Sequence, residues 1–200
     1  MENKFNISEL VCTRISHDLI GNIGAFSNAM ELLEDDDNDK SFIDESHQML
    51  KRISSVLSAR LKFFRLVFGS TNSNLEKTNI IETTATEYLD TLNPNARISL
   101  SICPVEGKAD FNRVLLLAIM IGAEVLIRGG KIYITAEDGF IKVKSVSDAP
   151  LSELKIKDMQ RVINGEKVDN QAQYVALYYL QQMGAELNIA FDNEFCLTIK

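Results

Sequence analysis

The first part of the chain carries apolar residues at helical spacing. Between residues 7 and 34 they recur at steps of four and three, which at about 100° per residue brings them to one side of a helix. The members of this apolar stripe are Leu19, Ile23, Phe26, Met30 and Leu33. Asn6, followed by Glu9 three residues later, forms a capping box that predicts a helix start near Ile7. We expect this helix to end near Glu34.

A second helix is predicted from Ser41 to about Phe68, joined to the first by a polar turn at residues 35–39. Its apolar residues repeat every seven positions, at Ile43, Leu50, Leu57 and Phe64. Two such helices make an antiparallel hairpin. Some apolar residues exceed what the two helices can bury against each other, and they predict a homodimeric four-helix bundle. These surplus residues are Leu10, Ile20, Met49, Val56 and Phe63.

A small, polar stretch at residues 69–74 predicts a linker, so we expect a hairpin domain over residues 1–69, a linker over 70–78 and a second domain over 79–200. In the second domain, helical periodicity alternates with short apolar strands. Helices are expected near residues 80–92, 111–127, 152–163 and 169–183, and strands near 97–102, 131–136, 140–146, 186–191 and 195–199. This order predicts an α/β sandwich, so the fold class of the whole chain is α plus α/β.

Charge and cysteine content narrow the classes of partner and compartment. The formal charge of -7, from 28 acidic and 21 basic residues, argues against direct binding to nucleic acid or to an anionic membrane. The cysteines, Cys12, Cys103 and Cys196, form no CxxC pair, so neither a disulfide framework nor a zinc site is indicated. The start of the chain has no apolar signal region, and the apolar run at 114–127 is too short to span a bilayer. We expect a cytoplasmic protein with protein partners.

His17 is the candidate for chemistry. It lies on the side of the predicted helix away from the apolar stripe, and Gly21 and Gly24 share that side. Glycine inside a helix costs about 1 kcal/mol relative to alanine. The bare backbone leaves room for a partner protein to approach the imidazole, although an exposed histidine beside glycines that permit close helix packing fits the spacing equally well. The other histidine, His47, is interpreted as an ordinary surface residue.

The sequence around His17 resembles that of a known protein family. Ser16-His17-Asp18-Leu19, followed by Gly24-Ala25, Asn28 and Glu31-Leu32-Leu33, resembles the phosphoacceptor helix of the ChpT-type histidine phosphotransferases, relatives of the histidine-kinase dimerisation domain. The chain departs from that pattern at Asn22, where these helices usually carry proline. The resemblance implies that His17 is the phosphoacceptor.

The same resemblance implies roles for the neighbours of His17. Asp18 would orient or deprotonate the imidazole, and Ile20, Gly21, Gly24 and Asn28 would form the floor on which a partner docks. Arg14, one turn before His17, is also assigned to the partner-binding residues. It would balance phosphate charge, although an ordinary surface arginine fits its position equally well.

The second half resembles the ATP-binding domain of histidine kinases, most clearly from Gly122 to Ile134. The ligand positions differ: Gly122 stands where that family has a magnesium-holding asparagine, and residues 149–151 and 170–173 replace its glycines. Asp148 matches the position of the adenine-reading aspartate. The resemblance therefore implies a degenerate domain of the histidine-kinase ATP-binding type that binds no ATP.

Together the two halves imply a phosphorelay intermediate. His17 would take a phosphoryl group from the receiver domain of a hybrid histidine kinase and pass it to response regulators. The chain would need no cofactor of its own, because the receiver domain would supply Mg²⁺. Two alternatives stay open: a histidine kinase with an atypical ATP site, and a non-catalytic dimeric regulator that docks on kinases or receivers.

Overall fold

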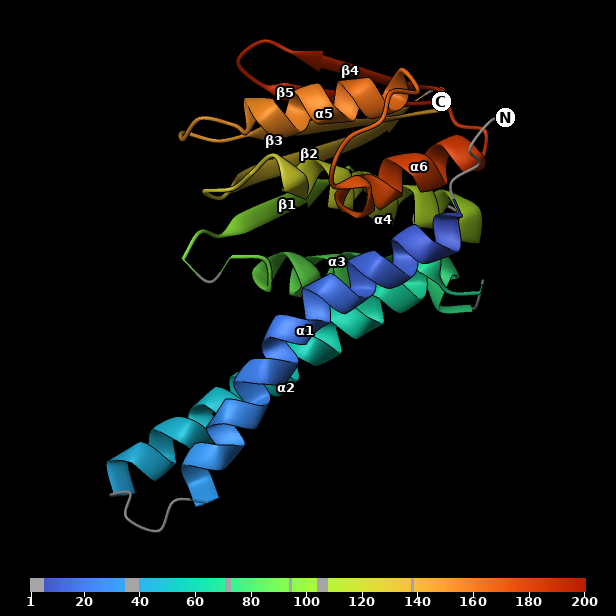
Figure 1. Ribbon diagram of the computed structural model, residues 1–200. Helices are drawn as coiled ribbons and strands as arrows, with labels where there is room; N and C mark the ends of the chain where they lie inside the picture. The colour runs from blue at the N-terminus through green and yellow to red at the C-terminus, as the bar shows by residue number, and fades with distance from the viewer. Residues whose placement is uncertain (1–5, 35–39, 71–72, 94, 104–107, 138) are drawn as a thin grey trace.

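The first helix begins where the sequence supplies a cap. The Ser8 N–H donates to Asn6 Oδ1 at 3.1 Å, and Asn6 Nδ2 donates to Glu9 Oε1 at 3.2 Å. Helix α1 then covers Ile7–Glu34, as predicted. The computed structural model describes residues 6–34, 40–70, 73–93, 95–103, 108–137 and 139–200, so the turn expected at 35–39 lies outside the described residues. Helix α2 covers Lys40–Phe68 and runs antiparallel to α1 (Figure 1).

The remaining elements follow the predicted order closely. The helices are η1 (Ser73–Glu76), α3 (Thr78–Asp90), α4 (Ala109–Glu124), α5 (Glu153–Ile163), η2 (Gln171–Tyr174) and α6 (Val175–Gln182). The strands are β1 (Ile98–Ile102), β2 (Gly130–Glu137), β3 (Phe140–Val146), β4 (Leu187–Phe191) and β5 (Phe195–Ile199). They form one five-stranded sheet in the order β1-β2-β3-β5-β4, in which β1 and β2 are parallel and the other pairs antiparallel. The predicted fold class, a helical hairpin followed by an α/β sandwich, is confirmed.

Within the described residues, the helices lie on one face of the sheet (Figure 1). Alternate strand residues, including Ile132, Ile134 and Val143, are buried beneath α4, and the residues between them are exposed or half-buried on the other face. Helix α4 is itself buried from Leu115 to Ala123. This burial explains the long apolar run in the sequence: α4 lies between the sheet and the other helices. No helix within the described ranges is long and apolar enough to cross a membrane.

The hairpin extends from the sheet-containing body as an arm, but its base belongs to the main core. Figure 1 shows the start of α1 and the end of α2 against α3, α4 and α6. Phe63 of α2 is fully buried, and its ring stacks on Tyr88 of α3 with centroids 3.8 Å apart. Leu75, in the segment predicted as a linker, is also fully buried. The base of the arm is therefore packed into the rest of the molecule.

The outer part of the arm buries a different side of α1 from the apolar stripe. Ala29 is fully buried, whereas Ile23, Phe26 and Met30 of the stripe are exposed, Ile23 by 53%. The surplus apolar residues fall into two groups, those covered within the chain and those that remain accessible on the arm. Phe63 is covered within the chain and Leu10 packs against the core, because the C-terminal half folds over the base of the hairpin. Val56 is half-buried, while Ile20 and Met49 are exposed on the arm.

Candidate functional site

His17 lies on the open side of α1, where the arm leaves the body. Its side chain is 81% exposed. A Cβ atom added at Gly21 or Gly24 meets no other group within 4 Å, so the backbone beyond His17 is open to solvent. Ile20, which is 68% exposed, and Asn28 are also accessible on this part of the helix. His47 is exposed on α2.

Asp18 is held beside the imidazole by the residues around it. Asp18 Oδ1 lies 3.3 Å from His17 Nδ1. Arg14 Nε donates to the other carboxylate oxygen, Oδ2, at 2.9 Å. Arg60 of α2 donates a further hydrogen bond to the backbone carbonyl of Asp18. Adjacent helical residues do not normally face each other, and these contacts explain how Asp18 nevertheless reaches His17.

Arg14 differs from the expectation of a partner-facing residue. Its side chain is only 10% exposed, because η2 packs over this turn of α1 and Glu124, at the end of α4, contacts it. Besides Asp18, it contacts Glu124 Oε1 through Nη2 at 2.7 Å and donates from Nη1 to the Gln173 carbonyl at 2.9 Å. Arg14 therefore joins the helix that carries His17 to the C-terminal half of the chain.

Glu124 completes this buried ionic cluster. Its second oxygen, Oε2, lies 2.8 Å from Lys155 Nζ and accepts a hydrogen bond from Gln173 Nε2 at 2.9 Å. The cluster thus links α1, α4, α5 and η2. In the part of the chain described, no three His, Cys, Asp or Glu side chains are arranged to hold a metal ion.

The electrostatics of the cluster favour charged side chains. Burial lowers the pKa of Arg14, but the negative charges of Glu124 and Asp18 outweigh it and leave the pKa above its ordinary value. For Glu124, burial raises the pKa, but Arg14 and Lys155 outweigh this effect and leave it below the ordinary glutamate value. Arg14 and Glu124 therefore form an ion pair at neutral pH.

Two cavities open beside His17. One, of about 250 Å³, lies between α1 and η2, with Glu124 on its wall. The other, of about 410 Å³, lies between the arm and the body and is lined by Arg60, Leu92 and Ile127 as well as by His17 and the ionic cluster. The imidazole is therefore accessible from the side of the arm and from the cleft at its base.

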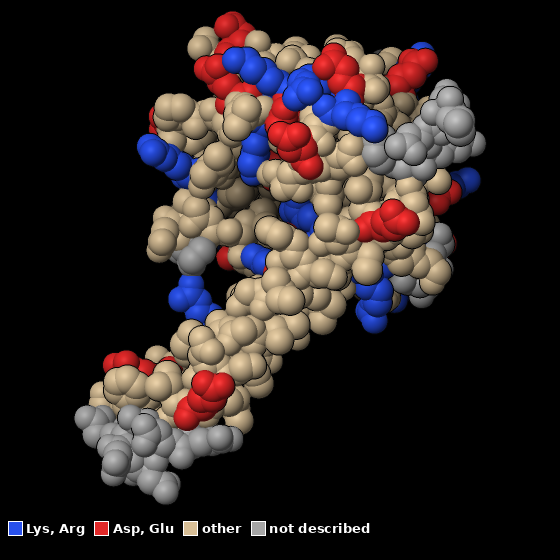
Figure 2. Space-filling view, in the orientation of Figure 1, with Lys and Arg blue, Asp and Glu red and all other residues tan. Residues whose placement is uncertain are grey.

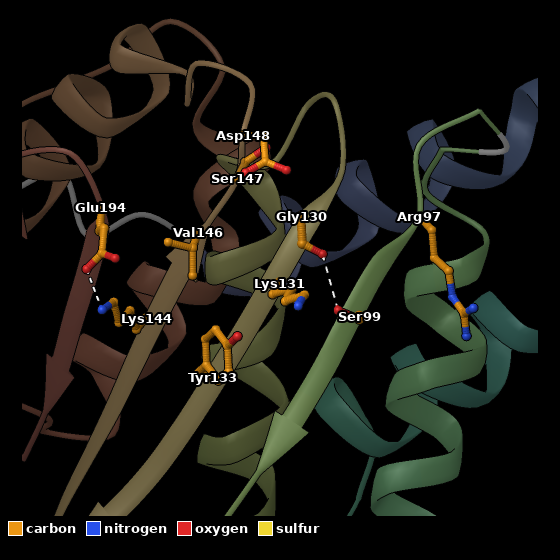
Figure 3. A pocket seen from close by; sticks show the side chains of 10 residues that line it. All are labelled: Arg97, Ser99, Gly130, Lys131, Tyr133, Lys144, Val146, Ser147, Asp148 and Glu194. Atoms are coloured by element: carbon orange, nitrogen blue, oxygen red, sulfur yellow. Dashed lines mark hydrogen bonds and ion pairs between the residues drawn. The ribbon is translucent and has the colours of Figure 1, made fainter.

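Three positions that the sequence resemblance compares with the ATP site of histidine kinases are Gly122, Gln173 and Asp148. A Cβ atom at Gly122 would lie 2.9 Å from Val143 Cγ1 and 3.0 Å from Ser145 Oγ, so the sheet leaves no room for a larger residue. Gln173 is engaged with Glu124. Asp148 lines a groove of about 780 Å³ on the sheet face away from α4, together with Lys131 and Tyr133 (Figure 3).

The structure brings together His17, Asp18 and Arg14, which the sequence predicted as site residues. It adds four residues that the sequence did not predict there: Glu124, Lys155, Gln173 and Arg60. Glu124 offered one signal, since it is the only charged residue in the apolar run at 114–127. Its partner, on a helix more than a hundred residues earlier, could not be identified from spacing.

Comparisons with known proteins agree with this architecture. Residues 81–194 match the family described as the histidine phosphotransferase C-terminal domain. Protein phosphotransferase ChpT of Brucella abortus (strain 2308) is 31% identical over 139 residues, which represent 66% of this chain and 61% of that protein. A solved structure of a bacterial phosphotransferase shares the fold, with a TM-score of 0.76 over 100% of this chain and 98% of that chain at 22% identity. Because the family match covers more than half of its residues, the chain belongs to the histidine phosphotransferase family.

Proposed function

We propose that the chain is a phosphorelay intermediate. His17 accepts a phosphoryl group from a receiver-domain aspartate of a hybrid histidine kinase and passes it to the receiver aspartates of response regulators. The main support for this proposal is the setting of the His17 side chain. The imidazole is 81% exposed, and its Nδ1 lies 3.3 Å from an oxygen of the largely buried Asp18. This leaves Nε2 accessible to a partner. Membership of the histidine phosphotransferase family supports the same role.

The proposed transfer begins at His17 Nε2. In the neutral ring, Nδ1 carries the proton and donates a hydrogen bond to Asp18. The lone pair of Nε2 is then available as a nucleophile. It attacks the phosphorus of the receiver's aspartyl phosphate; the N–P bond forms, the bond from phosphorus to the aspartyl oxygen breaks, and the carboxylate leaves. The ring gains positive charge, which the Asp18 carboxylate stabilises. In the second transfer, a receiver carboxylate attacks the same phosphorus and Nε2 leaves.

The charges and the metal on the phosphoryl side come from the partner in this proposal. Receiver domains would supply Mg²⁺, and this chain would contribute the imidazole, its orientation and the docking surface. The open backbone at Gly21 and Gly24, with Ile20 and Asn28 beside it, forms that surface. Arg14 does not contact the partner in this proposal; it acts indirectly, by holding the Asp18 carboxylate in place.

We further propose that the C-terminal half does not bind ATP. Three features support this: Gly122 packs tightly against the sheet, Gln173 is bonded to Glu124, and the Glu124 carboxylate is shared by Arg14 and Lys155. A nucleotide that entered between α4, α5 and η2 would have to break this ionic cluster. The phosphoryl group would therefore have to come from another phosphoprotein.

The arm is proposed to pair with a second copy of itself. Ile23, Phe26 and Met30 on α1 and Leu61 on α2 are exposed apolar residues. In the view of Figure 2, the arm shows few charged side chains between the body and the tip. A second hairpin would bury these residues in a four-helix bundle.

We place the protein in the cytoplasm, where its partners in a phosphorelay would be found. Its cysteines, Cys12, Cys103 and Cys196, are free thiols. Free thiols suit a reducing compartment.

A matched pair of histidine variants tests the relay. The purified protein is mixed with receiver domains carrying ³²P-aspartyl phosphate, and label is followed onto wild type, His17→Ala and His47→Ala. We expect wild type and His47→Ala to acquire acid-labile, alkali-stable label and to pass it to a second receiver, and His17→Ala to acquire none. Equal labelling of His17→Ala, or loss of label in His47→Ala alone, would contradict the assignment.

A further inference from the structure

We propose that Glu124, in the C-terminal half of the chain, is a positioning residue for His17. It acts by holding Arg14 so that Asp18 keeps one carboxylate oxygen for the imidazole. This inference rests on the proposed function, because it concerns the nucleophile of that reaction. It gives the C-terminal half a part in the chemistry of the phosphoacceptor.

Arg14 connects Glu124 to Asp18 through its guanidinium group. The Nε–H and one Nη2–H of a guanidinium point the same way and commonly bind both oxygens of a single carboxylate. Here that pair of donors is divided: Nε contacts Asp18 Oδ2 at 2.9 Å, and Nη2 contacts Glu124 Oε1 at 2.7 Å. The remaining amino group, Nη1, donates to the Gln173 carbonyl. All three nitrogens of the guanidinium are thus engaged, which fixes its plane.

Because Arg14 gives only one of its two parallel donors to Asp18, the second carboxylate oxygen, Oδ1, is left to accept a hydrogen bond from His17. That oxygen lies 3.3 Å from His17 Nδ1. If Glu124 were absent, Nη2 would be buried without its acceptor, which is costly. A small rotation of the side chain would let Arg14 bind both oxygens of Asp18, the common arrangement. The imidazole would then lose the acceptor that selects the Nδ1–H tautomer and orients the ring.

Glu124 is well placed to act as a fixed anchor. Its other oxygen is bonded to Lys155 and Gln173, and its side chain is 11% exposed. Glu124 is therefore held by residues of α5 and η2, outside the arm. A chain of contacts runs from α4 through Arg14 and Asp18 to the reactive ring.

The test uses substitutions that separate positioning from simple loss of charge. Glu124→Met removes the acceptor, Glu124→Gln retains one amide oxygen for Arg14, and Arg14→Lys keeps the positive charge but lacks the planar donors. Glu194→Met is the control, since Glu194 also forms an ion pair, with Lys144 of β3, but lies in the bend between β4 and β5 and outside the ionic cluster. Circular dichroism confirms that each variant is folded at the assay temperature.

The first readout is the tautomer of His17, measured by ¹⁵N NMR in the absence of any receiver. The chain has two histidines, so His17→Ala assigns the signals directly. We expect a single Nδ1–H tautomer in wild type and Glu194→Met, and a mixture in Glu124→Met and Arg14→Lys, with Glu124→Gln in between. A wild-type spectrum from folded Glu124→Met, or from Arg14→Lys should Glu124→Met not fold, would overturn the inference.

The second readout is the rate of phosphotransfer at saturating phospho-receiver, with receiver affinity measured separately. We expect Glu124→Met to lower the rate roughly ten- to a hundredfold, the size of effect seen when a metal-binding histidine loses its outer hydrogen-bond partner, and to leave affinity unchanged. Reduced affinity with an unchanged rate would overturn the positioning role. If no receiver labels the wild type, the proposed function fails, and the tautomer measurement still decides this inference.

Discussion

At the scale of single residues, the two nitrogens of His17 have different surroundings. Nδ1 faces a carboxylate that is 13% exposed, while the ring as a whole remains open to solvent. Such an arrangement suits a nucleophile that must meet a large partner, because the residue that orients it is shielded and the reactive side is not. Gly21 and Gly24 extend this accessibility along the helix.

Gly24 offers a test of that accessibility. A side chain at this position would project into open space, so substitution should not disturb packing. Both Gly24→Ala and Gly24→Gln are expected to stabilise the protein by up to about 1 kcal/mol, because both residues favour helix over glycine. Only the longer glutamine should obstruct docking and slow transfer, by about tenfold, which corresponds to ~1.4 kcal/mol of activation free energy.

Urea unfolding and receiver-transfer kinetics, run side by side on these two variants, separate stability from docking. Wild-type transfer by Gly24→Gln would show that the receiver does not approach over this part of α1. Equal slowing by alanine would point to a change in helix shape instead.

At the scale of elements, Arg14 and Glu124 join α1 to α4 through a pair that is almost fully buried. Removing one partner of a buried ion pair typically costs roughly 3–5 kcal/mol, because the other charge is left without compensation. We expect Glu124→Met to lose free energy of unfolding in this range at neutral pH. Arg14→Met with Glu124→Met should recover part of the loss.

This contribution depends on pH in a defined direction. The pKa of Glu124 is lowered in the folded state, so near pH 4 the unfolded state binds more protons than the native state. The stabilisation is fully present above the ordinary glutamate pKa of about 4.3 and is lost as the pH falls through the lower, folded-state value. Urea unfolding at several pH values should show the stability gap between wild type and Glu124→Met narrowing below that pH. A gap that widens in acid would contradict the ion pair.

The bounds of the elements were largely predictable because local rules determine them. The capping box at Asn6 located the start of α1, and the alternation of apolar residues located β3 over residues 140–146. The side of α1 that is buried was harder to predict. The stripe from Leu19 to Leu33 has coiled-coil spacing, yet α2 covers the neighbouring side, which includes Ala29. Periodicity identifies an apolar face but not its partner.

At the scale of the whole molecule, the arm exposes apolar residues that the body does not cover. Ile23, which is 53% exposed, lies on the part of α1 beyond the core. Such a surface would be explained by a second copy of the hairpin. Phe63 and Leu10, at the base of the arm, are not available for that pairing, because the C-terminal half of the chain already covers them.

A charge on the arm should therefore separate the two copies. We expect the wild type to have about twice the 22.4 kDa mass of one chain in multi-angle light scattering. Ile23→Asp should shift the mass to that of one chain. Leu154→Asp, on a residue of α5 that is 74% exposed, should leave the mass unchanged. A single-chain mass for wild type would contradict the proposed dimer.

The contacts of the site within helix α1 could be predicted from the sequence, but those between distant helices could not. Arg14 and Asp18 are four residues apart on one helix, so their contact follows from helical geometry. The contact of Arg14 with Glu124 depends on how two distant helices pack, and no local pattern encodes it. The residues that hold the nucleophile in place thus became apparent only from the tertiary structure.

The central claim is that His17 receives its phosphoryl group from a receiver domain and not from ATP. The most direct test offers both donors to the same preparation: [γ-³²P]ATP with Mg²⁺ in one reaction, and ³²P-labelled phospho-receiver in the other. Our account predicts label on His17 from the receiver alone, with none from ATP and none on His17→Ala. Label from ATP would identify a kinase, and the absence of label from every receiver tried would identify a regulator that docks without chemistry.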